Sequence, residues 1–181
     1  LWGFQRHGVL PDIVTMGKPM GNDQPIAGLL ATADVLAEFG KTSRYFNTFA
    51  GNTVSCVAAL AVLDTIERDR LVQHADKVGK VLHDGIAALA GRHEAIGDVR
   101  GAGLFVGVEL VSDRASRAPD RELTSQVVNR MRDKGVLISA CAMGHNVLKI
   151  RPPLVLTADQ AGLVIQALDE SLAEAKAAGR S

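Results

Sequence analysis

The chain has 181 residues, and its 20 basic and 20 acidic residues cancel to a formal net charge of zero. This balance gives no reason to expect nucleic acid or an anionic membrane as a partner. No apolar run approaches membrane-spanning length, and the chain is long enough for one domain or for two modest lobes. It opens on Leu1 without an initiator methionine, so we expect a fragment.

The two cysteines, Cys56 and Cys141, lie far apart in apolar surroundings. Neither belongs to a Cys-x-x-Cys motif or stands at metal-ligand spacing from a histidine, and the five histidines show no such spacing among themselves. We therefore expect no metal site. The cysteine usage favours reduced thiols and a cytoplasmic location.

A short apolar run ends abruptly at Lys18. Residues 13–16 predict a brief buried strand, and Gly17, Pro19 and Gly21 each predict a turn or a break after it. A lysine held on a rigid loop at a strand's end suits nucleophilic work, because desolvation disfavours the ammonium form. The alternative, a solvated loop lysine among glycines, stays open from this stretch alone.

Residues 26–31 predict a second strand, and residues 34–39 predict a brief helix that Gly40 closes. Residues 45–52 are dense in hydroxyl, amide and aromatic groups, which is typical of a loop that carries a site. Small and aliphatic residues dominate residues 53–68, so we expect a mostly buried helix there.

Thr48 lies in the loop before this helix, and Asn52 or Thr53 is placed to cap it. The backbone N–H groups at the helix start would then suit an anion held by the loop. The same residues could equally cap and hold a turn without any ligand.

Residues 71–181 predict a small α+β lobe with a mainly antiparallel sheet. The expected elements are a helix at 71–89, a strand at 98–110, a polar loop at 111–121, a helix that Gly135 ends, strands at 136–139 and 147–151, and a last helix with a capping box at Thr157 and Gln160.

Two nucleotide-binding motifs are suggested and both fail. After Gly101 and Gly103 the third glycine falls at Gly107, and a strand follows where the dinucleotide fingerprint requires a helix. A P-loop is excluded because Pro19 follows Lys18. Nucleotide binding is therefore disfavoured.

Arg151 stands at the end of an expected strand. If Leu148 and Ile150 face the core, alternation sends Lys149 and Arg151 to the opposite face. A guanidinium held there can clamp a carboxylate or a phosphate, because its donors match two oxygens at once. The alternative is a solvated sheet edge, where cationic side chains blunt strand pairing.

Four stretches, in matching order and spacing, resemble the class III (ω-type) pyridoxal-phosphate-dependent aminotransferases. They are residues 2–18, 46–52, 96–104 and 148–154. The resemblance covers nearly the whole chain but only the C-terminal part of a family member. It implies an α/β fold: the end of the fold type I large domain, with the cofactor lysine, at residues 1–70, and a small C-terminal domain at 71–181.

The resemblance also implies roles for single residues. Lys18 would join pyridoxal phosphate as a Schiff base and then move the substrate proton, and Thr48 would bind the cofactor phosphate, usually that of the partner subunit. Arg151 would bind a substrate carboxylate. The implied enzyme is a homodimer that transfers an amino group from an amine or amino acid to a keto acid or aldehyde.

The chain departs from the family pattern in both motif loops. Asp23 stands where members often have glycine, and Ala50 and Thr53 replace a glycine and a proline. Aspartate tolerates a left-handed turn better than most residues, so we expect the lysine loop to keep its shape. The family's other cofactor-binding parts belong upstream of Leu1, so we expect the isolated chain to be inactive.

Residues 47–56, 136–140 and 146–150 look most like the alanine–glyoxylate-aminotransferase-like branch, which includes phospho-lyases that act on ethanolamine phosphate. In that alternative, Lys149 and Arg151 would bind a phosphate, and the products would be an aldehyde, ammonia and phosphate. A catalytically inactive fragment that keeps the fold without cofactor is a further alternative.

Overall fold

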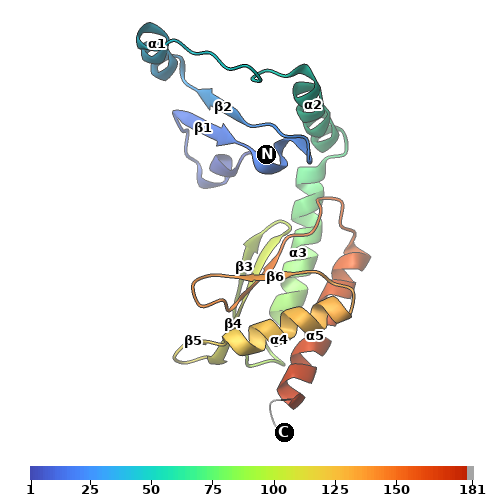
Figure 1. Ribbon diagram of the computed structural model, residues 1–181. Coiled ribbons are helices and arrows are strands. Elements are labelled where there is room, and N and C mark those ends of the chain that lie inside the picture. The colour runs from blue at the N-terminus through green and yellow to red at the C-terminus, as the bar shows by residue number, and fades with distance from the viewer. Residues whose placement is uncertain (179–181) are drawn as a thin grey trace. The chain divides into compact units, whose positions relative to one another are not determined.

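A computed structural model describes residues 1–178 of the protein (Figure 1). The chain forms two compact units, Leu1–Arg70 and Leu71–Ser181. Each unit has its own sheet, and every strand pairing in both sheets is antiparallel.

The first unit is built around a two-stranded sheet. In β1 and β2, Ile13 lies opposite Ala31 and Met16 lies opposite Gly28. The elements of this unit are η1 (Gly3–His7), β1 (Ile13–Met16), η2 (Lys18–Gly21), β2 (Gly28–Ala31), α1 (Ala33–Thr42) and α2 (Thr53–Arg68). Both predicted strands are therefore confirmed, the second beginning two residues later than expected.

The prediction that Gly40 closes α1 is wrong, because the helix continues to Thr42 and the chain leaves it at Ser43 in an extended conformation. Glycine ends a helix by adopting a left-handed conformation, and Gly40 is not among the residues with positive φ. The helix ends where the Ser43 N–H bonds the Phe39 carbonyl, at 2.9 Å.

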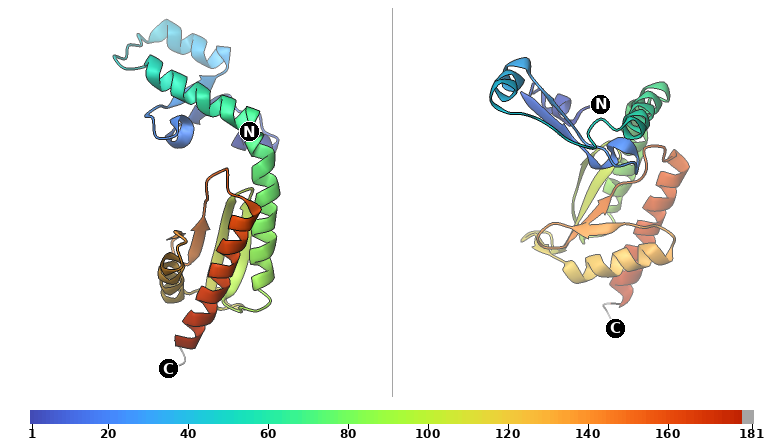
Figure 2. Two further views of the ribbon diagram at one scale, coloured as in Figure 1. Left: turned by 90° about the vertical axis from the view of Figure 1, so that its right-hand side faces the viewer. Right: turned by 45° about the horizontal axis from the view of Figure 1, so that its top comes forward.

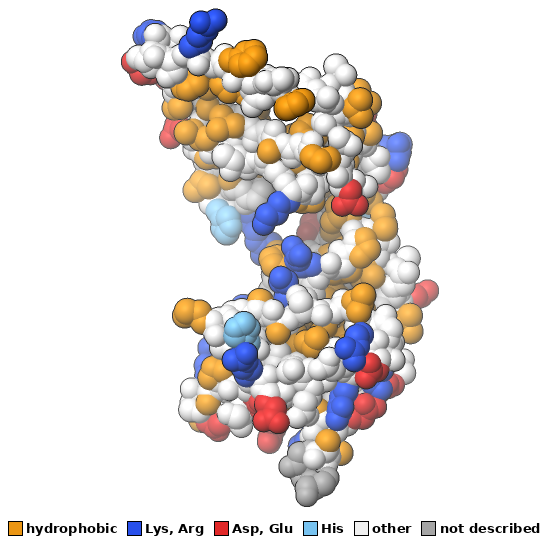
Figure 3. All heavy atoms as spheres, in the orientation of Figure 1, with side chains coloured by type: hydrophobic (Ala, Val, Ile, Leu, Met, Phe, Trp, Pro, Cys, Tyr) orange, Lys and Arg blue, Asp and Glu red, His pale blue; other side chains and the backbone are white. Residues whose placement is uncertain are grey.

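The expected burial of the first unit is also wrong. Ala59 is the buried hydrophobic residue of α2, whereas Val54 and Val57 are 67% and 65% exposed and Ile13 in β1 is 50% exposed. Figure 3 shows hydrophobic side chains over much of the visible surface of this unit. Apolar composition predicts that a segment seeks burial, but residues 1–70 do not supply enough partner surface for it.

The second unit contains the hydrophobic core. Its sheet has the strand order β3-β4-β7-β6, with β5 paired to β4. The elements are α3 (Leu71–Leu89), β3 (Ile96–Ala102), β4 (Phe105–Asp113), β5 (Ala118–Pro119), α4 (Arg121–Asp133), β6 (Ser139–Cys141), β7 (Val147–Ile150) and α5 (Ala158–Ala178).

Three helices pack on one face of this sheet. Val108 and Leu148 on the central strands are fully buried, and they belong to one cluster with Leu82 of α3, Met131 of α4 and Leu168 of α5. Helices α3 and α5 lie side by side in this layer (Figure 2). The arrangement buries the apolar stripe of each helix against the alternating inward residues of the strands.

The prediction of a single strand over 98–110 is wrong. The chain forms a hairpin in which β3 and β4 pair with Ala102 opposite Phe105, and Gly103 turns the chain with a φ of +50°. The alternation of Val106, Val108 and Leu110 indicates β4 alone, and extending it back to Asp98 hides the turn.

Two neighbouring predictions also shift. The expected loop at 111–121 begins inside β4, contains β5 and ends at the first residue of α4. The strand expected at 136–139 is β6, which starts at Ser139. The capping box at the start of α5 is confirmed, since Thr157 N donates to Gln160 Oε1 at 3.0 Å and Gln160 N donates to Thr157 Oγ1 at 3.2 Å.

Across the described residues, no helix combines the length and apolar content that crossing a lipid bilayer requires.

Candidate functional site

Lys18 begins the turn that follows β1. It is the first residue of η2, directly after Gly17, and its side chain is exposed. Its φ is +50°, a left-handed conformation that few residues other than glycine adopt. Within residues 1–178, no salt bridge or hydrogen bond engages the Lys18 Nζ. A primary amine is thus held on a strained backbone position at a strand end, which is a pattern found at functional sites.

Two further left-handed residues, Asn22 and Asp23, complete this turn, with φ values of +47° and +77°. The expectation that Asp23 keeps the glycine-like conformation is therefore confirmed. Gly21 is buried, and a Cβ at this position would lie 2.7 Å from Ile26 Cγ2. The turn after Lys18 therefore depends on the close approach of the Gly21 backbone to the Ile26 side chain, which a larger residue at position 21 would prevent.

We expect Asp23→Gly to raise the free energy of unfolding by a few tenths to about 1 kcal/mol, because glycine adopts a positive φ without the steric cost that Asp23 carries. Thermal unfolding of the native polypeptide measures the change. Asp34→Gly is the matched control: Asp34 lies in the first turn of α1, so glycine there should lower stability. A loss of stability in Asp23→Gly would contradict the strain argument.

Thr48 lies in a loop that is held by its own side chains. Asn47 Oδ1 accepts hydrogen bonds from the N–H groups of Phe49 and Ala50, both at 3.0 Å. Thr48, between them, is exposed. Such a turn fixes the backbone on both sides of the threonine and leaves its hydroxyl available.

The loop leads directly into α2. Asn52 caps the helix as predicted, because its Oδ1 accepts from Ser55 N at 3.1 Å. The helix starts at Thr53, five residues beyond Thr48 in the sequence, so the hydroxyl and the helix dipole belong to one local structure. This combination suits an anion, although the capping role alone explains Asn52.

One contact in the first unit has no sequence signal. Gln24 Nε2 donates to Ser55 Oγ at 3.0 Å, and this partly buried bond joins residues 31 positions apart. It links the turn that follows Lys18 to the first turn of α2. The sequence alone assigns neither side chain a partner, since only the fold brings the two residues together.

Arg151 lies in the second unit, directly after β7, and is exposed. Leu148 and Ile150 are buried, at 0% and 3% exposure, so both face the core as predicted. The register aligns Arg100, Gly107, Lys149 and Ser139 in one row across the sheet. Lys149 therefore lies on the sheet face that the three helices leave open, and Arg151 directly follows the same strand.

Arg100 in this row is already paired. Its Nη1 donates to Asp98 Oδ2 and Glu109 Oε2, both at 2.6 Å. These hydrogen bonds, first that of Asp98 and then that of Glu109, raise the pKa of the Arg100 guanidinium above its ordinary value. Within the described residues, no salt bridge engages Lys149, which lies in this row, or Arg151, which follows β7. Both cationic side chains therefore lack an acidic partner there.

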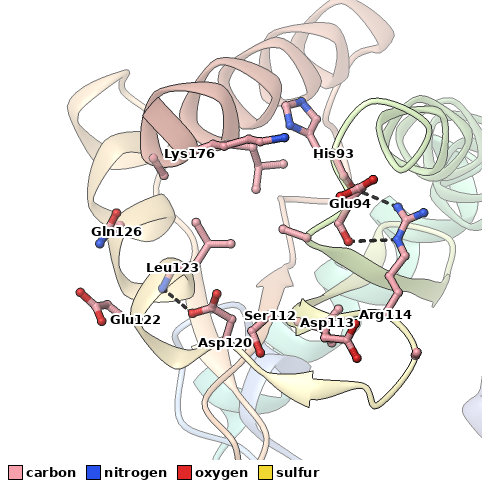
Figure 4. Close-up of a pocket in the computed structure, with 15 residues that line it drawn as sticks. His93, Glu94, Ser112, Asp113, Arg114, Asp120, Glu122, Leu123, Gln126 and Lys176 are labelled. Carbon is pink, nitrogen blue, oxygen red and sulfur yellow. Dashed lines mark hydrogen bonds between the residues drawn. The ribbon is translucent and has the colours of Figure 1, made fainter. Parts of the chain in front are cut away.

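A hollow of about 850 Å³ lies elsewhere in the second unit (Figure 4). The residues that line it include His93, Glu94, Arg114, Asp120, Gln126 and Lys176. None of Lys18, Thr48 and Arg151 lines this hollow.

Two of the polar residues around the hollow, Arg114 and Asp120, have structural partners. Arg114 donates to the carbonyls of Ala90, His93, Glu94 and Ile96, and it thereby ties the segment after α3 to the end of β4. Asp120 caps α4 by accepting from Leu123 N at 2.9 Å. These contacts stabilise the fold and assign no ligand to the hollow.

The sequence of this chain matches a protein family and named members of other proteomes. A model of the family "Aminotransferase class-III" matches residues 1–172. An Arabidopsis thaliana protein named alanine–glyoxylate aminotransferase 2 homolog 2, mitochondrial, is 44% identical over 96% of this chain and 36% of its own length. Ethanolamine-phosphate phospho-lyase homolog 1 of Caenorhabditis elegans is 38% identical over 94% of this chain and 37% of its length.

Among solved structures, a phospholyase from Arthrobacter in complex with phosphoethanolamine superimposes with a TM-score of 0.91 and 45% identity. The match covers 95% of this chain and 41% of that one. The chain therefore spans only about two fifths of the length of the proteins it matches.

Proposed function

Because the chain belongs to the class III aminotransferase family, we propose that it is the part of a pyridoxal-phosphate-dependent aminotransferase that supplies the cofactor lysine. The observation that carries the proposal is Lys18, whose exposed and unengaged amine lies on a strained turn at a strand end. The reaction proposed for the complete protein is transfer of an amino group from an amine or amino acid to a keto acid or aldehyde.

The residues present fit the cofactor. Lys18 offers an accessible primary amine, and Thr48 offers a hydroxyl close in sequence to a helix N-terminus. Pyridoxal phosphate supplies an aldehyde that a lysine amine can bind, a phosphate, and an electron sink that acidifies the substrate Cα–H. In the proposed arrangement, Lys18 would hold the cofactor covalently until the amine of the substrate takes its place, and the Nζ released in this way would accept the proton from the substrate Cα.

Thr48 and Arg151 bind anionic groups in this proposal. The Thr48 hydroxyl donates to the cofactor phosphate, and the first-turn N–H groups of α2 favour the same negative charge. Arg151, unpaired within the described residues, binds a substrate carboxylate with its planar donor fork.

The domain assignment belongs to the same proposal. We assign residues 1–70 to the end of the fold type I large domain and residues 71–181 to the small C-terminal domain. The complete enzyme would be a homodimer whose Thr48 binds the cofactor phosphate of the partner subunit. A cytoplasmic location stays a prediction, and the names of some relatives place those proteins in mitochondria.

A second candidate is a phospho-lyase that removes phosphate and ammonia from a phosphorylated amino alcohol. Two observations favour it: the cations Lys149 and Arg151 lie at the end of β7 and directly after it, and the Arthrobacter phospholyase is 45% identical to this chain. Two cations match the charge of a phosphate better than that of a carboxylate. With ethanolamine phosphate, one water would be consumed and acetaldehyde, ammonia and phosphate released.

Two assays on the native polypeptide that carries this chain separate the candidates. Transamination predicts amino transfer that requires a keto acid, with no phosphate released from ethanolamine phosphate. Phosphate release in the absence of a keto acid, together with acetaldehyde, would favour the lyase instead. If neither activity appears while the protein binds pyridoxal phosphate, both proposed reactions are wrong.

We expect Arg151→Ala to raise KM for the anionic substrate about 10- to 100-fold with a smaller effect on kcat, because a charge-assisted hydrogen bond contributes to binding throughout the reaction. Steady-state kinetics over a range of substrate concentrations measure both parameters. Arg132→Ala is the control, since Arg132 is an exposed arginine of the same unit that pairs with its neighbour Asp133. An unchanged KM in Arg151→Ala would contradict the assigned role.

A further inference from the structure

The Gln24–Ser55 hydrogen bond lies between the two loops that the proposed function uses. It is the one side-chain hydrogen bond within residues 1–70 that joins segments far apart in the sequence; the others span at most four residues. The bond is partly buried, and η2 packs against α2. Such a bond fixes the distance between two surface turns.

At one end, Gln24 is coupled to the Lys18 turn through the backbone. Gln24 N donates to the Gly21 carbonyl at 3.1 Å, and Met20 N donates to the Gly17 carbonyl at 3.3 Å. The missing side chain of Gly21 leaves room for Gln24, whose Cβ would lie 3.3 Å from an added Cβ. A shift of Gln24 therefore displaces the strained turn that carries Lys18.

At the other end, Ser55 is coupled to the Thr48 loop. Ser55 N donates to the Asn52 side chain at 3.1 Å, and Asn52 N donates to the Phe49 carbonyl at 3.3 Å. Asn47, which precedes Thr48, accepts a hydrogen bond from Phe49 N, which follows it. A continuous set of hydrogen bonds thus leads from Gln24 to both sides of Thr48.

We propose that Gln24 and Ser55 are positioning residues that hold the Lys18 turn in register with the start of α2. This inference rests on the proposed function, because it gives the contact a role toward the cofactor. Neither side chain needs to touch the reacting atoms. Within residues 1–178 no salt bridge orients Lys18, so the orientation of its backbone, with a φ of +50°, sets the direction in which its side chain leaves the turn.

In the arrangement proposed above, Lys18 and Thr48 of one chain serve the two different sites of a homodimer. The Gln24–Ser55 bond would then link the lysine of one site to the phosphate-binding loop of the other. Loss of either partner should consequently weaken attachment of the cofactor at Lys18 even though no cofactor-binding group is removed.

The test measures attachment of pyridoxal phosphate to Lys18 in the native polypeptide. The protein is incubated with increasing pyridoxal phosphate, reduced with borohydride and digested, and mass spectrometry gives the modified fraction of Lys18. We expect Gln24→Ala and Ser55→Ala each to raise the half-saturating concentration about 3- to 10-fold, with little further change in the double variant. Ser55→Thr retains the hydroxyl and should restore the wild-type value.

Thr42→Ala is the matched control. The Thr42 hydroxyl also makes a hydrogen bond within the first unit, because it donates to the Glu38 carbonyl at 2.8 Å. It should leave the half-saturating concentration unchanged. A second readout is the pH midpoint of the visible absorbance of the bound cofactor, which we expect to shift in Gln24→Ala and Ser55→Ala but not in the control. A merely structural hydrogen bond would lower thermal stability without moving this midpoint.

Hydrogen exchange of residues 17–26 without cofactor shows whether the bond restrains the turn. Faster exchange in Gln24→Ala and Ser55→Ala, with weaker attachment at Lys18, supports the inference. Faster exchange with unchanged attachment and midpoint overturns it. If the wild-type protein itself is not modified at Lys18, the proposed function fails, and the inference that rests on it fails with it.

Discussion

Lys18→Ala is expected to abolish covalent attachment of pyridoxal phosphate and to lower kcat/KM on the order of a thousandfold or more. The expected loss is large because the substitution removes both the group that holds the cofactor and the base that moves the substrate proton. Steady-state activity and the visible absorbance of the bound cofactor measure the two effects. Neither the turn geometry nor the hydrogen bonds of η2 require the lysine side chain, so the fold should persist.

Lys41→Ala is the control for this substitution. Lys41 is an exposed lysine of the same unit whose nearest carboxylate, on Glu38, lies 4.0 Å away. Its removal should change neither absorbance nor activity. Full activity in Lys18→Ala would show that the covalent chemistry resides elsewhere and would refute the assignment of the cofactor lysine.

Gly79→Ala should lower the free energy of unfolding of the second unit by about 2 to 3 kcal/mol. Gly79 lies on the buried face of α3, and an added Cβ would meet the backbone carbon and oxygen of Gly103 at 2.2 Å. Gly103 turns the chain between β3 and β4, so relief of the overlap would require the helix and the hairpin to separate. A backbone neighbour cannot rotate away as a side chain can.

Gly162→Ala, in the same unit, should change the free energy of unfolding in the opposite direction. Gly162 lies in α5 with no heavy atom within 4 Å of an added Cβ. Alanine there should raise the free energy of unfolding by about 0.5 to 1 kcal/mol, because it is the better helix former. Urea denaturation followed by circular dichroism measures both variants. A Gly79→Ala protein as stable as the wild type would contradict the close approach of α3 to the hairpin.

Local signals predicted the helices of this fold well. The bounds of α2 and α3 agree with the sequence reading, because caps and helical periodicity are properties of adjacent residues. The same holds for the capping box at the start of α5. The turn at Lys18 was likewise predicted from its glycines and proline.

Features that depend on residues far apart in the sequence could not be predicted from local signals. Burial of Ile13 and Val57 was predicted from their apolar character, yet burial requires partner surface, and the chain spans only 36–41% of the relatives and structure compared above. The hairpin turn at Gly103 was missed because the alternation of β4 was extended back over the residues before Phe105. Gln24 and Ser55 were missed because 31 residues separate them.

The most direct test of this account is to identify the lysine that pyridoxal phosphate modifies. The native polypeptide is incubated with the cofactor, reduced with borohydride and mapped by peptide mass spectrometry. The account predicts a phosphopyridoxyl group on Lys18 at cofactor concentrations that leave exposed lysines such as Lys41 and Lys80 unmodified. Equal modification of these lysines, or selective modification of a lysine other than Lys18, would contradict it.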